Sequence, residues 1–419
     1  MLLGAIADDF TGATDLANSL TRRGMPCLQL NGLPEPDETI GEEAAVVIAL
    51  KTRSAPPDDA VEQSLQALGW LRKRGCEKLF FKICSTFDST DRGNIGPVAE
   101  ALLAALGGEI AVVCPAVPEN RRTVYQGHIF VGDRLLSETG MRDHPLTPMT
   151  DSNLVRVLGR QCRGAVGLLP HSKVASGPSE IAQTMAELRE AGVRFAIVDA
   201  IGEADLLAIA EGSEDLPLLV GGSGLALGLP ALFRRRGRLA EEARVPAPAV
   251  EGAAAVLSGS CSEATNAQVA AMCAAQPSYR LDPAALARDD GAVEAALDWA
   301  EAHLAEGPIL LYATARPDEV SAVQAALGRE RAGALVERAM ATLARGLLRL
   351  GVRRLVVAGG ETSGAVVSAL GLRRLAIGPE IAPGVPWTFS GDSPPIALAL
   401  KSGNFGGPDF FAEAFEVLS

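Results

Sequence analysis

Short apolar runs alternate with helical stretches along almost the whole chain of 419 residues, and polar residues follow most of the runs. A run of about four to eight apolar residues is typical of a buried strand. Strands that alternate with helices form a largely parallel sheet covered by helices, so the pattern predicts an α/β fold. The expected strands are 2–7, 26–30, 45–50, 79–81, 110–114, 165–169, 195–199, 216–220, 253–257, 309–312, 355–358 and 396–400.

A change in composition at residues 234–252 divides this pattern into two parts. Charged residues come first and alternating proline and alanine follow, which is typical of a linker between domains. The strand–helix alternation then starts again at Ala253. We therefore expect two domains, each a mainly parallel sheet flanked by helices, with the active site in the interdomain cleft. Their expected bounds are 1–235 and 253–419, joined by a linker at 236–252.

Charge and composition exclude several classes of partner. Hydrophobic residues make up 48% of the chain and charged residues 21%, as expected for a folded globular protein. The formal net charge is −13, so the chain lacks the excess of lysine and arginine that neutralises the phosphates of nucleic acids. A local basic pocket for a small anion remains compatible with this charge. No apolar run approaches the roughly 18 residues of a membrane-spanning helix, so we expect no membrane partner.

The cysteines and the N-terminus indicate a cytoplasmic location. The seven cysteines are dispersed without a CxxC pair, which favours a reducing compartment. The first seven residues contain no basic residue, and Asp8 and Asp9 follow them directly. This pattern differs from that of a signal peptide. The four histidines form no HExxH motif or close pair, which argues against a zinc site, and the metal-binding residues stay unknown. A homo-oligomer is compatible with the sequence, which does not fix the number of subunits.

The stretch 79–96 is the richest in chemically useful side chains. Its apolar start is followed by Lys82, by a cluster of hydroxyl and acidic residues that includes Ser85 and Asp88, and by a helix that begins near Pro97. In open α/β sheets, ligands bind beyond the carboxyl ends of the strands. This loop offers a cation for an anionic group, hydroxyls for hydrogen bonds and a carboxylate that can accept a proton. An ordinary surface turn is the alternative, since Ser, Thr and Asp are common turn residues.

Other expected strand ends in the first half also carry charges. Asp8 and Asp9 follow the first apolar run, Arg53 follows the third, and Arg122 lies after the run at 110–114. One of the two carboxylates can cap the next helix, but the other needs a partner such as a substrate hydroxyl or a metal ion. Charges of both signs at strand ends suit a small acid that bears hydroxyl groups.

Residues 125–149 lack a clear period and are long for a loop in a compact domain. We therefore expect a lid or a small subdomain there. The second half instead offers three loops rich in glycine and serine at strand ends: SGSCS at 258–262, GGETSG at 359–364 and KSGNFGG at 401–407. Glycine lets the backbone approach a phosphate, and the free amides at a helix N-terminus bind it.

None of these three loops is a Walker A or GxGxxG motif, and any one alone could be a tight turn. Three of them at strand ends of one domain favour a cradle for a nucleoside triphosphate. A domain for a polar acid and a domain for a nucleotide together suit phosphoryl transfer. That reaction needs positioning, neutralisation of charge and a carboxylate near the acceptor hydroxyl.

Seven motifs, in order along nearly the whole chain, resemble the four-carbon acid sugar kinase family. They are ADDFTGA near the N-terminus, LKTRS at 50–54, KICSTFDSTDRGNIGPV at 82–98, SGSCS, GGETSG, IAPGVPW at 381–387 and ALKSGNFG at 399–406. The STFDST form of the third motif, and the pairing of GGETSG with IAPGVPW, are most similar to the 3-oxo-tetronate kinase branch of that family.

This resemblance implies an N-terminal domain that binds a sugar acid and a C-terminal domain that binds ATP. It implies ATP-dependent phosphorylation of the terminal C4 hydroxyl of 3-oxo-tetronate, in the catabolism of four-carbon acid sugars. The residues implied to contact ATP are Ser258, Gly359, Gly360, Glu361, Thr362, Ser363 and Gly403. Contacts to the sugar acid are expected at Asp8, Asp9, Arg53, Lys82, Ser85, Asp88 and Arg122.

We assign roles to these residues as hypotheses. Arg53 and Lys82 hold the substrate carboxylate, and Asp8 or Asp9 orients or deprotonates the attacking hydroxyl, with Asp88 as a third catalytic candidate. Backbone amides of the GGETSG loop hold the phosphates, and Mg²⁺ bridges their oxygens. An Asp8→Asn, Asp9→Asn or Asp88→Asn variant should lose turnover with little loss of folding.

Three alternatives remain at this point. The first is a D-threonate or D-erythronate kinase of the same family. The second is a sensor that binds a sugar acid and a nucleotide without turnover, although the sequence shows no DNA-binding motif or basic face. The third is an oxidoreductase that uses a dinucleotide, which the missing GxGxxG disfavours. The sequence does not distinguish a D from an L substrate.

Overall fold

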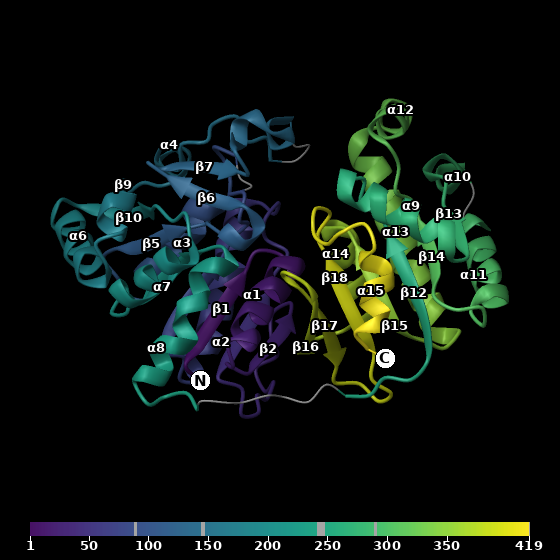
Figure 1. Ribbon diagram of the computed structural model, residues 1–419, viewed down its shortest axis with the longest axis horizontal. Coiled ribbons are helices and arrows are strands. Elements are labelled where there is room, and N and C mark those ends of the chain that lie inside the picture. Colours follow the sequence, from purple (N-terminus) through teal and green to yellow (C-terminus); the bar gives the residue numbers. More distant parts are fainter. Residues whose placement is uncertain (88–89, 144–146, 241–247, 289–290, 419) are drawn as a thin grey trace. The chain divides into compact units, whose positions relative to one another are not determined.

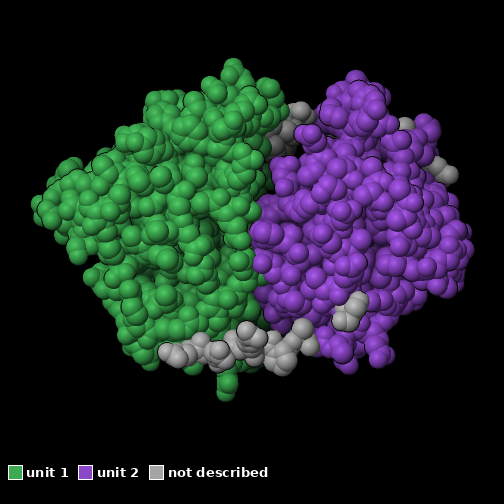
Figure 2. Space-filling model, viewed as in Figure 1, with its two compact units in different colours: residues 1–244 green, residues 245–419 purple. Residues whose placement is uncertain are grey.

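The computed structural model describes residues 1–87, 90–143, 147–240, 248–288 and 291–418 (Figure 1). The chain divides into two compact units, Met1–Arg244 and Val245–Ser419, hereafter unit 1 and unit 2 (Figure 2). The division falls inside the segment 236–252 that the sequence suggests as a linker. Each unit has a mainly parallel sheet flanked by helices, so the predicted α/β class is confirmed.

The sheet of unit 1 has the strand order β2-β3-β1-β4-β11-β5-β10-β9, and each of these neighbouring pairs is parallel. Its central strands are buried along their whole length, which explains why they read as continuous apolar runs rather than as alternating ones. The strands are β1 (Leu3–Ala7), β2 (Cys27–Asn31), β3 (Ala45–Ala49), β4 (Lys78–Lys82), β5 (Ala111–Cys114), β9 (Ala165–Leu169), β10 (Val193–Val198) and β11 (Leu218–Gly221).

The helices of unit 1 begin at residues suited to that position. Asp9 caps α1 by accepting a hydrogen bond from the Gly12 N–H, and proline occupies the first turn of α2 and α6. The helices are α1 (Phe10–Arg22), α2 (Pro57–Lys73), α3 (Ile95–Ala105), α4 (Leu154–Gly159), α5 (His171–Val174), α6 (Pro178–Glu190), α7 (Glu203–Gly212), α8 (Leu229–Arg235) and the 3₁₀ helix η4 (Ser223–Gly228).

The segment after β5, which lacked periodicity in the sequence, contains a small antiparallel sheet of order β6-β7-β8. Gln126 and Gly127 form the turn between β6 and β7 with φ of 50° and 70°, the conformation of a tight hairpin. His144 to Leu146 lie outside the described residues. The elements are η1 (Pro118–Asn120), β6 (Arg122–Tyr125), β7 (His128–Val131), β8 (Arg134–Leu135), η2 (Leu136–Glu138) and η3 (Gly140–Asp143).

The strands of unit 2 lie in the order β13-β14-β12-β15-β18-β17-β16. The pairs from β13 to β18 are parallel, and β17 pairs antiparallel with both β18 and β16. The sequence analysis did not predict β13, β16 or β17. The strands are β12 (Ala253–Ser258), β13 (Ser278–Arg280), β14 (Ile309–Tyr312), β15 (Val352–Ala358), β16 (Arg374–Ala382), β17 (Val385–Ser390) and β18 (Ala397–Lys401).

Two apolar clusters pack around alternate residues of the unit 2 strands. Leu257 and Val357 belong to one cluster, and Val256 and Val356 belong to the other. Gly328, which has φ of +79°, separates α12 from α13. The helices are α9 (Glu263–Ala275), α10 (Pro283–Arg288), α11 (Gly291–His303), α12 (Pro317–Leu327), α13 (Arg329–Arg349), α14 (Gly360–Leu370) and α15 (Phe410–Glu416).

Both units place their first four strands in the same spatial order. The order is β2-β3-β1-β4 in unit 1 and β13-β14-β12-β15 in unit 2. In each case the first strand connects toward one edge of the sheet, while the fourth, its neighbour, connects toward the other. Ligands of open α/β sheets bind at such switch points, beyond the carboxyl ends of the strands. The expected positions are therefore the ends of β1 and β4 and of β12 and β15. Within the described residues, no helix is long and apolar enough to span a membrane.

Candidate active site

At the switch point of unit 1, the ends of β1, β3 and β4 meet. The Asp8 N–H donates to the Lys82 carbonyl at 3.2 Å, and the N–H groups of Thr52 and Arg53 donate to the Asp8 carbonyl at 3.0 and 3.1 Å. These backbone bonds hold Asp8, Arg53 and Lys82 side by side, although Asp8 and Lys82 are 74 positions apart in the sequence. The charged strand ends singled out in the sequence therefore form one cluster.

Arg53 joins the two adjacent carboxylates. Its Nε donates to Asp8 Oδ2 at 3.0 Å and its Nη2 donates to Asp8 Oδ1 at 2.7 Å, while Nη2 also lies 2.8 Å from Asp9 Oδ1. The side chains of Arg53 and Asp8 are only 24% and 7% exposed, so this charge pairing takes place largely away from water. Arg53 thus neutralises the carboxylates, and part of its hydrogen-bonding capacity is already used.

The two carboxylates differ in environment. Burial raises the pKa of Asp8 above its ordinary value, despite the opposing charge of Arg53. Burial also acts on Asp9, but the charges of Arg53 and Lys82 outweigh it and lower the pKa of that carboxyl. Asp9 further accepts hydrogen bonds from the Gly12 N–H and the Thr11 hydroxyl, both at 2.9 Å. Asp9 is therefore the helix cap, and Asp8 is the better proton acceptor.

Lys82 and a carboxylate that the sequence analysis missed complete the cluster. Lys82 is 2% exposed and donates to the Ile83 carbonyl at 2.9 Å. Asp15 lies on α1, where burial raises its pKa against a hydrogen bond from Ser223 and the charges of Lys82 and Arg122. Asp15 lies within α1 and not at the end of a strand, so the search for charged strand ends did not find it. Its place among the buried residues of α1 was the only available signal.

The remaining predicted residues of unit 1 have different outcomes. Arg122 donates to the Asn120 carbonyl at 3.1 Å, and its charge acts on Asp15, so it belongs to the same cluster. Ser85 is half-buried in the turn that follows β4. Asp88 lies outside the described residues.

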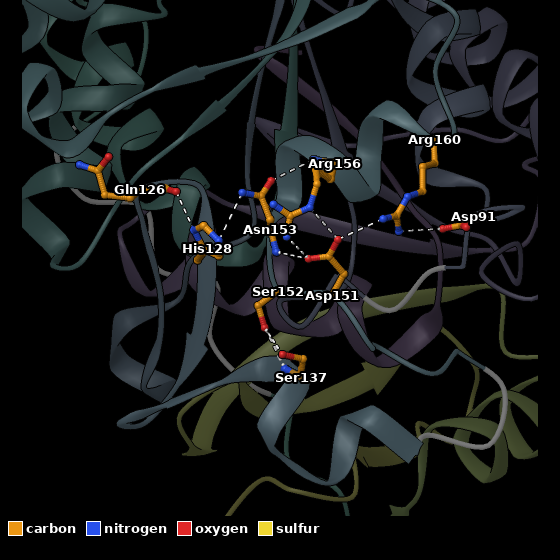
Figure 3. Close-up of polar contacts among 9 residues, drawn as sticks. All are labelled: Asp91, Gln126, His128, Ser137, Asp151, Ser152, Asn153, Arg156 and Arg160. Carbon is orange, nitrogen blue, oxygen red and sulfur yellow. Dashed lines mark hydrogen bonds and ion pairs between the residues drawn. The ribbon is translucent and has the colours of Figure 1, made fainter.

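A second carboxylate cluster of unit 1, absent from the sequence predictions, surrounds Asp151 (Figure 3). Arg156 donates to it from Nε at 3.0 Å and from Nη2 at 2.7 Å. Arg160 joins two aspartates: its Nη2 lies 3.2 Å from Asp151 Oδ2, and its Nη1 lies 3.3 Å from Asp91 Oδ1. Asn153, two residues further on, caps α4 by accepting a hydrogen bond from the Arg156 N–H. These contacts tie the start of α4 to its surroundings.

The two clusters contain the same bidentate pair, but the pKa of the aspartate shifts in opposite directions. The distances from Arg156 to Asp151 equal those from Arg53 to Asp8. Arg156, however, is 58% exposed, and its hydrogen bonds lower the pKa of Asp151, whereas burial raises that of Asp8. Geometry alone therefore does not decide the protonation behaviour of these carboxylates; the loss of water around Asp8 does.

At the switch point of unit 2, hydroxyls and glycines replace the charges. The hydroxyls of Ser258 and Thr314 lie 2.6 Å apart, and Ser258 is fully buried. A Cβ at Gly259 would lie 2.3 Å from Thr362 Oγ1, and Gly359 has φ of +125°. Glycine is therefore required at both positions, because the loops after β12 and β15 pack backbone against side chain.

The N-terminus of α14 is well placed to bind an anion. No side chain caps it, Gly360 and Glu361 are exposed, and Thr362 and Ser363 are buried. Among the described residues, the buried Ser363 hydroxyl has no hydrogen-bond partner. Open amides and the positive end of the helix dipole at a glycine-rich turn fit the phosphates of a nucleotide.

The third loop of unit 2 meets the first. A Cβ at Gly403 would lie 2.7 Å from Ser260 Oγ, and the Ser262 hydroxyl donates to the Gly403 carbonyl at 2.6 Å. The Gly359 N–H donates to the Lys401 carbonyl at 2.8 Å, which connects the second loop to the third. The seven residues proposed to contact ATP, from Ser258 to Gly403, thus lie at the end of β12, at the start of α14 and in the loop after β18, and these segments contact one another.

Two domain models match this chain, one within unit 1 and one within unit 2. A family model described as a sugar-binding N-terminal domain matches residues 3–229, and one described as a nucleotide-binding C-terminal domain matches residues 255–411. The chain is 59% identical to a 3-oxo-tetronate kinase of Cupriavidus necator and 57% identical to one of Burkholderia multivorans. Each alignment covers 100% of this chain and 97% of the relative.

Two solved structures are similar to this chain over nearly its whole length. The crystal structure of a proposed tRNA synthase from Salmonella typhimurium LT2 is 44% identical, with a TM-score of 0.87 and coverage of 98% of each chain. A Haemophilus influenzae protein is 43% identical, with a TM-score of 0.78, and the match covers 99% of this chain and 100% of that one. The motifs, the two domain matches and the full-length relatives together show that the chain belongs to the four-carbon acid sugar kinase family.

Proposed function

We propose that this protein is an ATP-dependent kinase that phosphorylates the C4 hydroxyl of 3-oxo-tetronate to give the 4-phosphate. The observation that carries the proposal is identity of 57–59% over the full chain to relatives named 3-oxo-tetronate kinase. The charged cluster of unit 1 and the glycine-rich loops of unit 2 supply sites of the two chemistries that this reaction needs. The seven dispersed cysteines form no disulfide within the described residues, which suits a cytoplasmic enzyme.

We assign binding of the sugar acid to the cluster of unit 1. Because Arg53 is paired with both Asp8 and Asp9, we give the substrate carboxylate mainly to Lys82 and leave Arg53 to hold Asp8 in place. The proton-accepting role goes to Asp8, whose pKa is raised by burial. Ser85, Arg122 and Asp88 remain proposed contacts to the acid. Asp15 joins them, because its charge environment is shared with Lys82.

The transfer step follows from these roles. The C4 oxygen attacks the γ-phosphorus of ATP as its proton passes to Asp8, a bond forms between that oxygen and phosphorus, and the bond to the β,γ-bridging oxygen breaks to release ADP. Backbone amides at the start of α14 would hold the phosphates. We propose that Mg²⁺ accompanies ATP, since this ion usually binds through phosphates, waters and one or two carboxylates. Glu361 is the carboxylate of that loop.

The experiment is ATP consumption by the purified chain with Mg²⁺ and a panel of acids: D- and L-3-oxo-tetronate, D-threonate, D- and L-erythronate and a blank without acid. Rapid turnover confined to one 3-oxo acid would support the proposal and fix the hand of the substrate. Turnover on threonate or erythronate would keep the family and replace the substrate. Folded protein that binds ATP without turnover on any acid would favour a sensor.

A further inference from the structure

Lys401 is a buried lysine that the proposed mechanism does not use. It is the last residue of β18 and is 0% exposed, and its ammonium lies 5.9 Å from the centre of the Phe410 ring. Burial lowers its pKa to about 7. All three donors of its ammonium have acceptors within unit 2, so none is left for a nucleotide, unlike in the lysine of a P-loop.

The acceptors around Lys401 match an ammonium group. Its Nζ lies 3.1 Å from Thr265 Oγ1, 3.0 Å from the Ser402 carbonyl oxygen and 2.9 Å from that of Gly403. An ammonium has three N–H donors and no lone pair, so three acceptors satisfy it completely. The side chain is thus a fixed connection between the end of β18, α9 and the loop that follows Lys401.

The Gly403 carbonyl is the centre of this arrangement. Three donor groups lie within hydrogen-bond distance of its oxygen: Lys401 Nζ at 2.9 Å, Thr265 Oγ1 at 2.9 Å and Ser262 Oγ at 2.6 Å. A carbonyl oxygen has two lone pairs, so these donors hold it firmly in one orientation. Gly403 itself is tightly packed, since a Cβ there would lie 2.7 Å from Ser260 Oγ.

The orientation of that carbonyl determines where the next amide points. The peptide between Gly403 and Asn404 is trans, since the only cis bond among the described residues is Ser393-Pro394. In a trans peptide the C=O and the following N–H point in opposite directions. With the Gly403 oxygen turned toward Lys401, the N–H of the exposed Asn404 points away from it. The described residues offer that N–H no backbone acceptor.

We propose that Lys401 is a positioning residue for the nucleotide: it fixes the Gly403 carbonyl inside unit 2 and thereby presents the Asn404 N–H to a phosphate oxygen. This inference rests on the proposal that unit 2 binds ATP. The backbone of Lys401 also meets the second nucleotide loop, since its carbonyl accepts from the Gly359 N–H. The Lys401 side chain shares the Gly403 carbonyl with Ser262 of the first loop, so it acts where the first and third loops meet.

Unit 1 contains a natural control. Lys78 is 7% exposed and donates from Nζ to the carbonyls of Ser213, Glu214 and Leu216 at 3.1, 2.9 and 2.9 Å. It stands at the start of β4, at the opposite end of the strand from Lys82. Loss of Lys78 should therefore destabilise the fold as loss of Lys401 does, without any effect on either ligand.

The experiment compares Lys401→Met, Lys78→Met and wild type in the full chain by calorimetric titration with ADP, by melting temperature and by steady-state kinetics. We expect both variants to melt earlier. Only Lys401→Met should weaken ADP binding, by about tenfold or more, and raise the KM for ATP while the KM for 3-oxo-tetronate stays unchanged. A purely structural lysine would not produce that difference between the two ligands.

A milder variant covers the case in which Lys401→Met does not fold. Thr265→Val preserves shape but removes one donor to the Gly403 carbonyl, so ADP should bind about threefold more weakly. Folded Lys401→Met with the ADP affinity of wild type, or Thr265→Val with unchanged affinity when Lys401→Met is unfolded, would overturn the proposal. The ADP titration needs no sugar acid, so a failure of the substrate assignment in the acid panel remains a separate result.

Discussion

The two units arrange their first four strands in the same order but place opposite kinds of residue at the strand ends. Asp8 and Asp9 follow β1 in unit 1, whereas Gly259 and Ser260 follow the corresponding strand β12 in unit 2. β4 ends in Lys82, whereas β15 ends in a buried alanine. Topology thus determines where each site lies, and the side chains determine what each site can bind.

The two units also differ in where their charged side chains lie. Unit 1 brings buried charges of both signs together, which suits an acid that needs both a counter-ion and a proton acceptor. Among the described residues of unit 2, Lys401 is the one buried lysine or arginine, and the strand ends around it carry glycine amides and hydroxyls instead of charges. Amides suit phosphates because they provide many donors at close approach without a bulky side chain.

The largest effect is expected at the proton acceptor of unit 1. Asp8→Asn should lower kcat by roughly 10²- to 10⁴-fold, because the amide cannot accept the proton of the attacking hydroxyl. Asp9→Asn should lower it less, since asparagine also caps helices well. Steady-state kinetics with saturating ATP measure both. Asp151→Asn is the control, as Asp151 has the same bidentate arginine outside the site. A kcat for Asp8→Asn equal to that of wild type would remove Asp8 from the mechanism.

A second prediction concerns stability and uses the two arginine–aspartate pairs of equal geometry. Arg53→Met should destabilise the protein by about 3 kcal/mol, because it leaves buried carboxylates without their counter-ion. Arg156→Met should change stability less, because the Arg156 side chain is 58% exposed and Asp151 keeps its ion pair with Arg160. Urea unfolding followed by circular dichroism measures the difference. Equal losses in the two variants would show that burial does not distinguish the pairs.

A smaller effect is expected from the pH dependence of the buried lysines. Burial lowers the pKa of Lys78 to about 8 and that of Lys401 to about 7, below the ordinary value of 10.5. Between those values and 10.5 the unfolded chain binds more protons than the folded one, so each lysine makes stability rise with pH. From pH 7 to 9, wild type should gain up to about 2 kcal/mol relative to Lys401→Met, and less relative to Lys78→Met.

The lysine variants are essential to this experiment, because the buried cysteine thiols make the stability of the protein fall as pH rises. Burial raises the pKa of Cys27 and Cys114, so the unfolded chain loses their protons first at high pH. Wild type and the lysine variants share these thiols, and their contribution cancels. A difference between wild type and Lys401→Met that stays constant or falls from pH 7 to 9 would mean that the lysine remains charged in the fold.

The central strands were predictable from the sequence, because fully buried parallel strands read as continuous apolar runs. The charged and glycine-rich residues at the ends of those strands were visible in the same way. Strand β13 is only three residues long, and β16 carries glycine and proline, so neither has the pattern of a strand. The sequence showed Asp8 and Arg53 as separate strand ends. Their pairing depends on the adjacency of β1 and β3, which no local pattern encodes.

Asp15 and Lys401 escaped prediction for a related reason. Asp15 matters because one face of α1 turns toward Lys82 and Ser223, and the sequence does not indicate which face that is. Lys401 belonged to a motif chosen for its glycines, and its burial follows only from the packing of Phe410 and α9 around it. Residues that act through their position in the packed fold are the ones that sequence patterns leave out.

The central claim is that acid and nucleotide bind at separate switch points, and titration of ADP into three variants tests it most directly. Gly259→Ala should weaken ADP binding about tenfold or more, because the new Cβ would lie 2.3 Å from Thr362 Oγ1. Gly391→Ala, where nothing lies within 4 Å, and Asp8→Asn should both bind ADP as wild type does. Loss of ADP binding in Asp8→Asn, or normal binding in Gly259→Ala, would contradict the division of roles between the units.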